Sequence, residues 1–199
     1  VKDIEAGDVV TIASDASSVV MGAKYNSSYY PYGSQTNVVK TGDYLYHPIT
    51  PEGTTDGKSV IQQLVVLQPD EAKDAFYFYN GVDYKGDSKN GFLRVEYSNK
   101  LSLQDNLDAN SLFYVDIDSE SGVASIVATD SKENNKYVYY YPSASLTSRS
   151  FRTQNSAPLV NQLVRIYKIP GAKGIVDASF SAPTNITLTN EAATNAIFE

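Results

Sequence analysis

Residues 114–117 read YVDI, and a similar four-residue run with apolar ends recurs along the chain. The runs are VVTI at Val9–Ile12, LVVL at Leu64–Leu67, YVDI at Tyr114–Ile117 and LVRI at Leu163–Ile166. Their first residues, at positions 9, 64, 114 and 163, lie 55, 50 and 49 positions apart. A steady period of this length is typical of a repeated structural unit. The pattern predicts three units of about 50 residues, ended by a fourth copy of the opening run.

A second series follows the same period and indicates that each unit holds several strands. NGFLRVEYS at Asn90–Ser98 aligns with NKYVYYYPS at Asn135–Ser143, and more loosely with SSYYPYGS at Ser27–Ser34. LSLQ at Leu101 aligns with SFRT at Ser150, 49 positions later. Most segments are short apolar or alternating runs bounded by Gly, Asn, Asp, Ser and Pro. This pattern is typical of an all-β protein.

Three similar units and a returning strand predict an all-β, β-trefoil-like closed barrel with pseudo-threefold symmetry. In this barrel LVRIYKI (163–169) pairs with DVVTI (8–12), which removes the exposed edges of an open sheet. A two-sheet β-sandwich is the alternative, because it uses the same strands without requiring a threefold period. We assign residues 1–169 to the barrel domain. Residues 170–199 are assigned to a linker, which includes GAKG, and a C-terminal extension with one extra strand as an option.

The composition excludes several classes of function. The 199 residues carry a net charge of −7 and a pI near 4.7, so the chain lacks the basic face that nucleic acid or anionic lipid requires. It has no Cys, which excludes disulfides and thiolate chemistry. No segment approaches the ~20 apolar residues of a membrane span, and no signal or anchor segment is recognisable in this chain. We expect a monomer without nucleic-acid or membrane partners.

Motifs for catalysis and metal binding are weak. The single His, His47, lies in a predicted loop and the chain lacks a G-x-S-x-G nucleophile motif. The 23 acidic residues show no distinguishable pair for glycosidase chemistry. In DIDSESG the residues Asp116, Asp118 and Glu120 alternate as in a calcium loop, but the full ligand spacing is missing. We therefore expect no enzyme, no cofactor and no metal, with a carboxylate-dependent hydrolase as the last alternative.

Tyrosines are the remaining candidates for a binding site. The chain has 16 of them, and a tyrosine ring stacks on a sugar face while its hydroxyl group forms hydrogen bonds. Three tyrosine groups stand out, YNSSYYPY (25–32), FYFYNGVDY (76–84) and YVYYYP (137–142). Each group is also compatible with a strand whose rings are divided between the core and the surface.

Strand alternation divides YVYYYP (137–142) into two faces, because it aligns with FLRVEY (92–97) of the preceding unit. Arg94 and Glu96 are charged and are expected to face water. The residues predicted to face the core are Leu93, Val95, Val138 and Tyr140. The same alternation places Tyr139, Tyr141 and Tyr29 outward, and Tyr30 and Tyr32 inward. The residues predicted to contact a ligand are Tyr139, Tyr141, Tyr29 and Tyr84.

Several segments together resemble a β-rich, trefoil-like accessory module. They are DVVTIAS, VVMGAKYNSSYY, GFLRVEYSNKLSLQDNLDANSLFYVDI, SGVASIVATD, NKYVYYYP, SFRTQN and LVRIYKI. The module occurs in secreted and surface proteins of Bacteroides-like bacteria, and the resemblance covers roughly residues 8–169. Two departures are visible, since the family's Trp is Phe113 or Tyr114 here and its GKYL strand reads NGFL and NKYV. The resemblance implies secretion or exposure on the cell envelope, an accessory role and no catalytic residue.

These observations predict a non-catalytic extracellular binding or accessory module whose partner is a glycan or another surface protein. A purely structural domain of a larger surface protein is the alternative. A binding module requires an exposed aromatic cluster beside Asn and Asp side chains, whereas a structural domain is expected to show scattered exposed tyrosines. A hydrolase requires a cleft with two close acids of unequal pKa.

Overall fold

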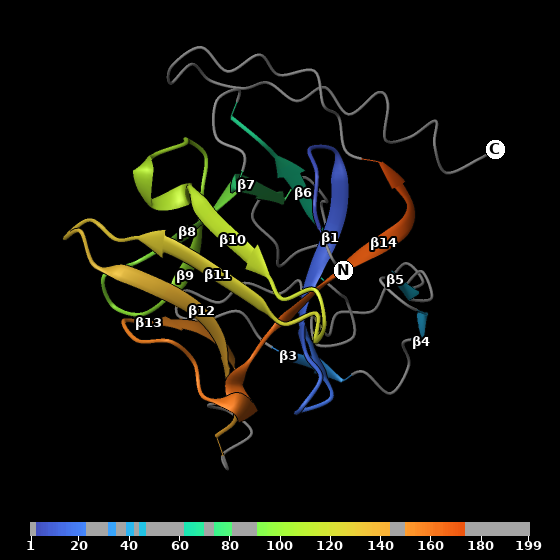
Figure 1. The fold of residues 1–199 in the computed structure, drawn as a ribbon. Helices are drawn as coiled ribbons and strands as arrows, with labels where there is room; N and C mark the ends of the chain where they lie inside the picture. Colours follow the sequence, from blue (N-terminus) through green and yellow to red (C-terminus); the bar gives the residue numbers. More distant parts are fainter. Residues whose placement is uncertain are drawn as a thin grey trace, which may run out of the picture.

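The computed structural model is all-β in the residues that it describes (Figure 1). These are residues 3–22, 32–34, 39–41, 44–46, 62–69, 74–80, 91–143 and 150–173. The strands are β1 (Asp8–Ser14), β2 (Val19–Met21), β3 (Tyr32–Ser34), β4 (Val39–Thr41), β5 (Tyr44–Tyr46), β6 (Leu64–Leu67), β7 (Ala75–Asn80), β8 (Gly91–Val95), β9 (Leu101–Gln104), β10 (Phe113–Ile117), β11 (Ala124–Thr129), β12 (Asn135–Tyr141), β13 (Ser150–Gln154) and β14 (Arg165–Lys173). Two 3₁₀ turns, η2 (Ala109–Ser111) and η3 (Val160–Gln162), precede β10 and β14. No helix long and apolar enough to cross a membrane occurs in this part of the chain.

Twelve of the strands fall into three units with one pairing pattern. In each unit the first strand pairs with the second and the fourth, and the second pairs with the third. Unit 1 is β1, β2, β3 and β6; unit 2 is β7, β8, β9 and β10; unit 3 is β11, β12, β13 and β14. In unit 3 the first-to-fourth contact is an isolated bridge, in which the Ala124 N–H donates to the Val164 carbonyl at 2.9 Å. Antiparallel pairs β6–β7, β10–β11 and β14–β1 join the units.

The all-β prediction and one specific strand pairing are confirmed. As predicted, β14 lies antiparallel to β1, with Ile12 opposite Ile166. The pairs between named strands form an open sheet that runs from β13 to β4, and β5 adds a parallel contact to β14. Between β11 and β14 the described residues contain only the Ala124–Val164 bridge. The sheet pairs alone therefore do not establish the closed barrel predicted from the sequence.

The phase of the repeat differs from the prediction. The runs that start at Leu64 and Tyr114 lie in β6 and β10, and the run that starts at Leu163 overlaps β14. All three are fourth strands of their units, whereas the run at Val9 lies in β1, a first strand. The run in β1 is buried throughout and the run in β6 is buried at three of four positions, so both read as short apolar runs. The run at Val9, which was predicted to be the first copy of the other three runs, is therefore a first strand and not a fourth strand.

Strand β14 continues through Lys173, past the predicted end of the domain at residue 169. The first part of the predicted linker GAKG is therefore strand. Residues 174–199, with the predicted extra strand, lie outside the described residues, and so do Tyr29, Tyr30, His47 and Tyr84.

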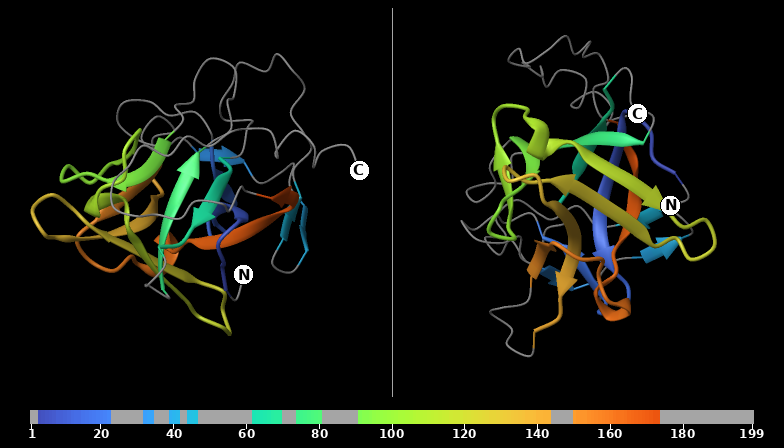
Figure 2. Two further views of the ribbon diagram at one scale, coloured as in Figure 1. Left: turned by 90° about the horizontal axis from the view of Figure 1, so that it is seen from above. Right: turned by 60° about the vertical axis from the view of Figure 1, so that its left-hand side comes forward.

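One apolar core lies between the three units, as the two views of Figure 2 show for the strands around it. The rings of Phe78 and Phe113 meet edge to face with centres 5.5 Å apart, and Tyr140 packs on Phe151 with centres 5.3 Å apart. Burial of each such ring contributes about 2–3 kcal/mol to stability. The four residues predicted to face the core, Leu93, Val95, Val138 and Tyr140, are all buried.

Candidate functional site

Strand β7 presents two tyrosines on its outer face. Its sequence AFYFYN alternates Phe and Tyr, and Phe76 and Phe78 are buried in the core. Because side chains alternate across a strand, Tyr77 and Tyr79 point away from the core, where they are half-buried. The Tyr79 ring rests on Phe92 of β8, with ring centres 4.9 Å apart. The alternation thus produces a pair of outward rings on a well-anchored strand.

Strand β10 adds a third ring to this face. Tyr114 is 56% exposed although both its neighbours, Phe113 and Val115, are buried. It lies directly opposite Ala75 of β7, which makes it a diagonal neighbour of Tyr77 on the same face. The small side chain of Ala75 leaves the Tyr114 ring uncovered.

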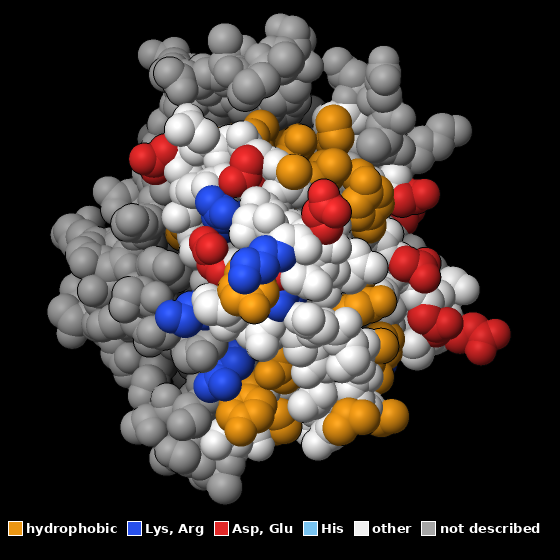
Figure 3. Space-filling model, turned by 90° about the vertical axis from the view of Figure 1, so that its left-hand side faces the viewer, with side chains coloured by type: hydrophobic (Ala, Val, Ile, Leu, Met, Phe, Trp, Pro, Cys, Tyr) orange, Lys and Arg blue, Asp and Glu red, His pale blue; other side chains and the backbone are white. Residues whose placement is uncertain are grey.

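Two aspartates lie beside these rings. Burial raises the pKa of Tyr77, and the nearby Asp108 carboxylate and Tyr114 raise it further. Burial also raises the pKa of Tyr79, with a second contribution from Asp105. We call Tyr77, Tyr79, Tyr114, Asp105 and Asp108 the tyrosine–aspartate surface. On the face in Figure 3, acidic and hydrophobic side chains lie next to one another.

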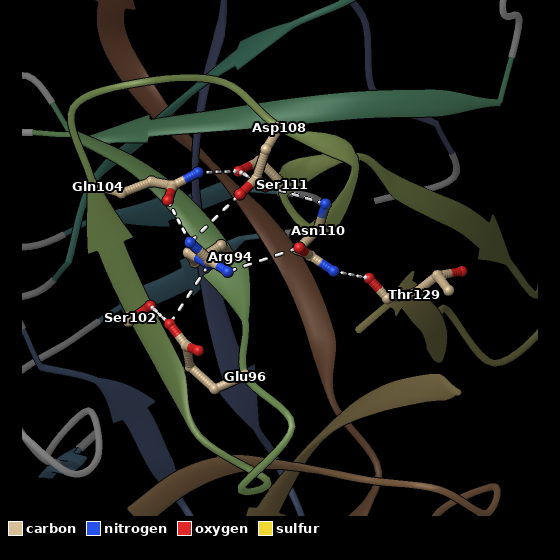
Figure 4. A network of polar contacts seen from close by, with 8 residues as sticks. All are labelled: Arg94, Glu96, Ser102, Gln104, Asp108, Asn110, Ser111 and Thr129. Atoms are coloured by element: carbon tan, nitrogen blue, oxygen red, sulfur yellow. Dashed lines mark hydrogen bonds and ion pairs between the residues drawn. The ribbon is translucent and has the colours of Figure 1, made fainter. Parts of the chain in front are cut away.

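Arg94 of β8 holds the loop that carries these aspartates (Figure 4). Its Nε lies 3.3 Å from Glu96 Oε1, and its Nη1 lies 3.2 Å from Asp108 Oδ2. The Nη1 group also donates to the side chain of Gln104, and Nη2 donates to Asn110 Oδ1 at 3.5 Å. We call this group of contacts the Arg94 network. The two Nη groups of Arg94 donate to Gln104 and Asn110, whereas its Nε is buried without a hydrogen-bond partner among the described residues.

The turn η2 is fixed from its other side as well. Asp108 Oδ1 accepts hydrogen bonds from the Asn110 backbone N–H at 2.9 Å and the Ser111 hydroxyl at 3.1 Å. This is the usual role of an aspartate that caps a turn. The Asn110 amide donates to the Thr129 carbonyl of β11 at 2.6 Å. The loop is thereby tied to β8, β9 and β11, so Asp108 has a defined position beside the tyrosines.

Arg94 and Glu96 therefore differ from the prediction that they face water freely. The Arg94 side chain is only 21% exposed and belongs to the network above. Glu96 accepts a hydrogen bond from the Ser102 hydroxyl at 2.5 Å, besides its contact with Arg94. Alternation gave the correct face of the strand, but the neighbouring loop covers that face.

The same correction applies to Tyr139, which was predicted to face outward. It is only 8% exposed, because Tyr141 lies edge-on against it with ring centres 6.5 Å apart, and Arg152 faces it across the β12–β13 pair. Tyr141 is half-buried, and the Arg152 guanidinium lies 4.2 Å from the centre of its ring. A ligand contact by Tyr139 or Tyr141 stays a prediction, although little of the Tyr139 ring is accessible. Tyr29 and Tyr84 cannot be placed, since they lie outside the described residues.

The weak metal candidates lie at the hairpin between β10 and β11. Asp118 accepts hydrogen bonds from the Ser121 hydroxyl and backbone N–H, both at 2.6 Å, and these bonds lower the pKa of Asp118. Its carboxylate therefore stabilises the turn. Asp116 and Glu120 are exposed. In the described part of the chain no three His, Cys, Asp or Glu side chains are grouped in a way that suits a metal ion.

The sequence analysis missed most of the tyrosine–aspartate surface. From FYFYNGVDY it selected Tyr84 and passed over Tyr77 and Tyr79, although their alternation with Phe marks them as outward. Tyr114 was noted only as a replacement for a family Trp. The two aspartates lie in a loop, and no local sequence pattern predicts that this loop lies beside the tyrosines.

No family model and no curated protein matches the chain by sequence. Among solved structures, the Haemophilus ducreyi cytolethal distending toxin aligns with a TM-score of 0.46 and 15% identity, covering 80% of this chain and 83% of that one. Cry35Ab1 aligns with a TM-score of 0.52 and 9% identity, covering 94% of this chain. This chain spans about 40% of the length of Cry35Ab1. The second likeness shows a shared β-rich fold and nothing about activity.

Proposed function

We propose that this protein is a non-catalytic binding module that recognises a glycan through the tyrosine–aspartate surface. The observation that carries the proposal is the open ring of Tyr114, 56% exposed, beside the outward rings of Tyr77 and Tyr79. The carboxylates of Asp108 and Asp105 contribute, after burial, to the raised pKa values of Tyr77 and Tyr79, and Arg94 holds Asp108 in place. This is the cluster of aromatic and acidic side chains that a binding module requires.

The chemistry of the surface suits sugars. The C–H face of a pyranose stacks on an aromatic ring, and its hydroxyl groups donate to carboxylate oxygens. A rigid support reduces the entropy lost on binding, and both β7 and the loop held by Arg94 provide one. One open ring with two half-buried neighbours makes a small site. We therefore expect a dissociation constant of about 1 mM to 10 μM, which corresponds to roughly 4–7 kcal/mol.

We also propose that the protein adopts a β-trefoil fold. Three units with one pairing pattern, joined by β6–β7, β10–β11 and β14–β1, support it. The Ala124–Val164 bridge lies where such a barrel would close. A crystal structure tests this part: units 1, 2 and 3 are expected to superpose by rotations of about 120° around one axis. An arrangement as two stacked sheets without that axis would contradict it.

The proposal also includes a location outside the cell, where the module accompanies other domains. This part rests on the resemblance of residues 8–169 to accessory modules of secreted and surface proteins. A surface glycan is then a ligand within reach. A purely structural role is the outcome if no ligand binds.

A glycan array followed by calorimetry tests the function. The wild type is expected to bind at least one sugar at millimolar concentration or below, and Tyr114→Ala to lose at least about tenfold in affinity. The matched control is Tyr97→Ala, because Tyr97 is 54% exposed but contacts Lys132, whose Nζ lies 3.7 Å from its ring centre. This control is expected to bind as the wild type does. Absence of any binding at millimolar concentration, or equal binding by Tyr114→Ala, would contradict the proposal.

A further inference from the structure

We infer that the tyrosine–aspartate surface selects its glycan by charge, binding sugars with a free amino group best and acidic sugars worst. This inference rests on the proposed function and adds the chemical class of the ligand. It follows from the distribution of charged residues around the three rings.

Aspartates belong to several of the segments that carry or border the three rings. Asp116 follows Tyr114 by two positions on the same outer face of β10 and is exposed. Asp74 immediately precedes β7, is exposed, and accepts a hydrogen bond from the Val115 N–H through its carbonyl at 3.0 Å. Asp105 and Asp108 lie on the side of η2. Four carboxylates thus belong to the segments that carry or border the rings.

Positive charge is scarce among the described residues of these segments. Residues 101–131, which include β9, η2, β10 and β11, contain six acidic residues and no Lys or Arg. The described residues of β7 also contain none. Arg94 is the cation that the structure places against Asp108, and its guanidinium also contacts Glu96, Gln104 and Asn110. The Arg94 guanidinium already contacts these groups and would have to release them to bind a carboxylate or sulfate.

The charges therefore favour a cationic ligand over an anionic one. An ammonium group is attracted both by the aspartates and by the faces of the tyrosine rings. A sugar carboxylate has no available cation and is repelled by the aspartates. Because the surface is open to water, each exposed charge pair changes affinity only modestly. We expect the affinity for an amino sugar to exceed that for its N-acetyl form about threefold to tenfold. The affinity for the N-acetyl form is expected to exceed that for the acidic form by a similar factor.

Two matched ligand series test the inference by calorimetry at pH 5.5, where the sugar amine is protonated. One series is glucosamine, N-acetylglucosamine and glucuronic acid; the other is galactosamine, N-acetylgalactosamine and galacturonic acid. The expected order is amino, then N-acetyl, then acidic, with the differences reduced at 0.5 M salt. In Asp105→Asn and Asp116→Asn the ratio of amino to N-acetyl affinity is expected to fall about threefold. The control Glu133→Gln changes an exposed acid on the β11–β12 turn and is expected to keep the wild-type ratio.

The outcomes separate this inference from the proposed function. Equal affinity for amino and N-acetyl sugars, or tighter binding of the acidic sugar, overturns charge selection. The proposed function survives that result if binding still depends on Tyr114. Failure of every sugar in both series to bind, together with an empty glycan array, overturns both.

Discussion

Two groups of tyrosines in two units of the repeat differ in their exposure to solvent. In unit 2, Tyr77, Tyr79 and Tyr114 lie on the outer face of paired strands, and Tyr114 is open to solvent. In unit 3, β12 carries Tyr139 and Tyr140 on opposite faces, and both are buried. The first group forms a surface, whereas the second is part of the packing of its hairpin.

The cross-strand partner explains the difference. Tyr114 faces Ala75, whose methyl group is too small to cover a ring. Tyr139 faces Arg152, whose long side chain covers the strand and stacks on Tyr141. Strand alternation alone decides which side of the sheet a tyrosine occupies. The residue on the next strand decides whether that side is accessible.

The largest expected effect comes from removing a buried ring of unit 3. Tyr140→Ala leaves a cavity next to Phe151 and is expected to lower the free energy of unfolding by about 3–5 kcal/mol. Urea denaturation followed by circular dichroism measures the loss. The matched change Tyr137→Ala, in the same strand but half-buried, is expected to cost about 1 kcal/mol. Equal losses for the two variants would contradict the assignment of Tyr140 to the core.

Unit 3 also depends on a buried lysine at the start of β12. Lys136, only 2% exposed, donates from Nζ to Asn99 Oδ1 at 2.6 Å, Asn155 Oδ1 at 2.5 Å and the Tyr97 carbonyl at 3.2 Å. The same Nζ lies 3.4 Å from Asp130 Oδ2. One ammonium group thus connects the β8–β9 turn, the β11–β12 turn and the loop after β13.

Replacing this lysine is expected to be the next largest effect. Lys136→Met keeps the apolar stem but leaves the buried Asp130 carboxylate without its charge partner and two amide oxygens without the donor that Lys136 supplies. We expect a loss of about 3 kcal/mol, the order found when one partner of a buried ion pair is removed. Lys132→Met is the control, since the Lys132 side chain contacts the Tyr97 ring and the substitution leaves the hydrogen bond from its backbone N–H to Asp130 in place, so it is expected to cost about 0.5–1 kcal/mol. Similar stabilities for the two variants would show that Lys136 is not needed.

Acid is expected to weaken unit 3 through Asp130. Burial raises the pKa of Asp130, but hydrogen bonds from the backbone N–H groups of Asn134 and Lys132 outweigh burial, so its pKa lies below the usual range. Because the folded pKa is below the unfolded one, this group stabilises the fold above about pH 4 and loses that contribution as pH falls. Between pH 5 and pH 2 the free energy of unfolding is expected to fall more steeply with decreasing pH for the wild type than for Asp130→Asn. Identical slopes would contradict this contribution.

The smallest effect on stability is expected at the exposed ring of unit 2. Tyr114→Ala is expected to change the free energy of unfolding by less than about 0.5 kcal/mol, because little of the ring is buried. Thermal unfolding measures the change. A loss above 2 kcal/mol would mean that the ring belongs to the packing, as Tyr140 does, and the contrast between the two units would disappear.

Local patterns in the sequence were sufficient for the strands and for several of their faces. The spacing of the runs at Leu64, Tyr114 and Leu163 identified equivalent strands, and alternation placed Val138 and Tyr140 in the core. The order of strands within a unit could not be read in this way. The runs in β1 and β6 both read as short apolar runs, and only their pairing distinguishes a first strand from a fourth.

The candidate site required contacts between distant segments. Tyr114 is exposed because Ala75 lies across from it, and this depends on the register of β7 against β10. Asp108 approaches Tyr77 because Arg94 holds the loop, which is a tertiary contact. The same reasoning explains why Tyr139 was predicted outward and is buried. Alternation gives the face of a residue, but it does not show what packs on that face.

The most direct test of the central claim is a nuclear magnetic resonance titration of protein labelled with carbon-13 at its tyrosine rings. The sugar that binds best in calorimetry is added stepwise, and each of the 16 tyrosine signals is assigned by Tyr→Phe substitution. We predict that the signals of Tyr77, Tyr79 and Tyr114 shift with one common dissociation constant, while those of Tyr139 and Tyr140 do not move. Shifts confined to the tyrosines of β12, with Tyr114 unchanged, would contradict the assignment of the binding surface to unit 2.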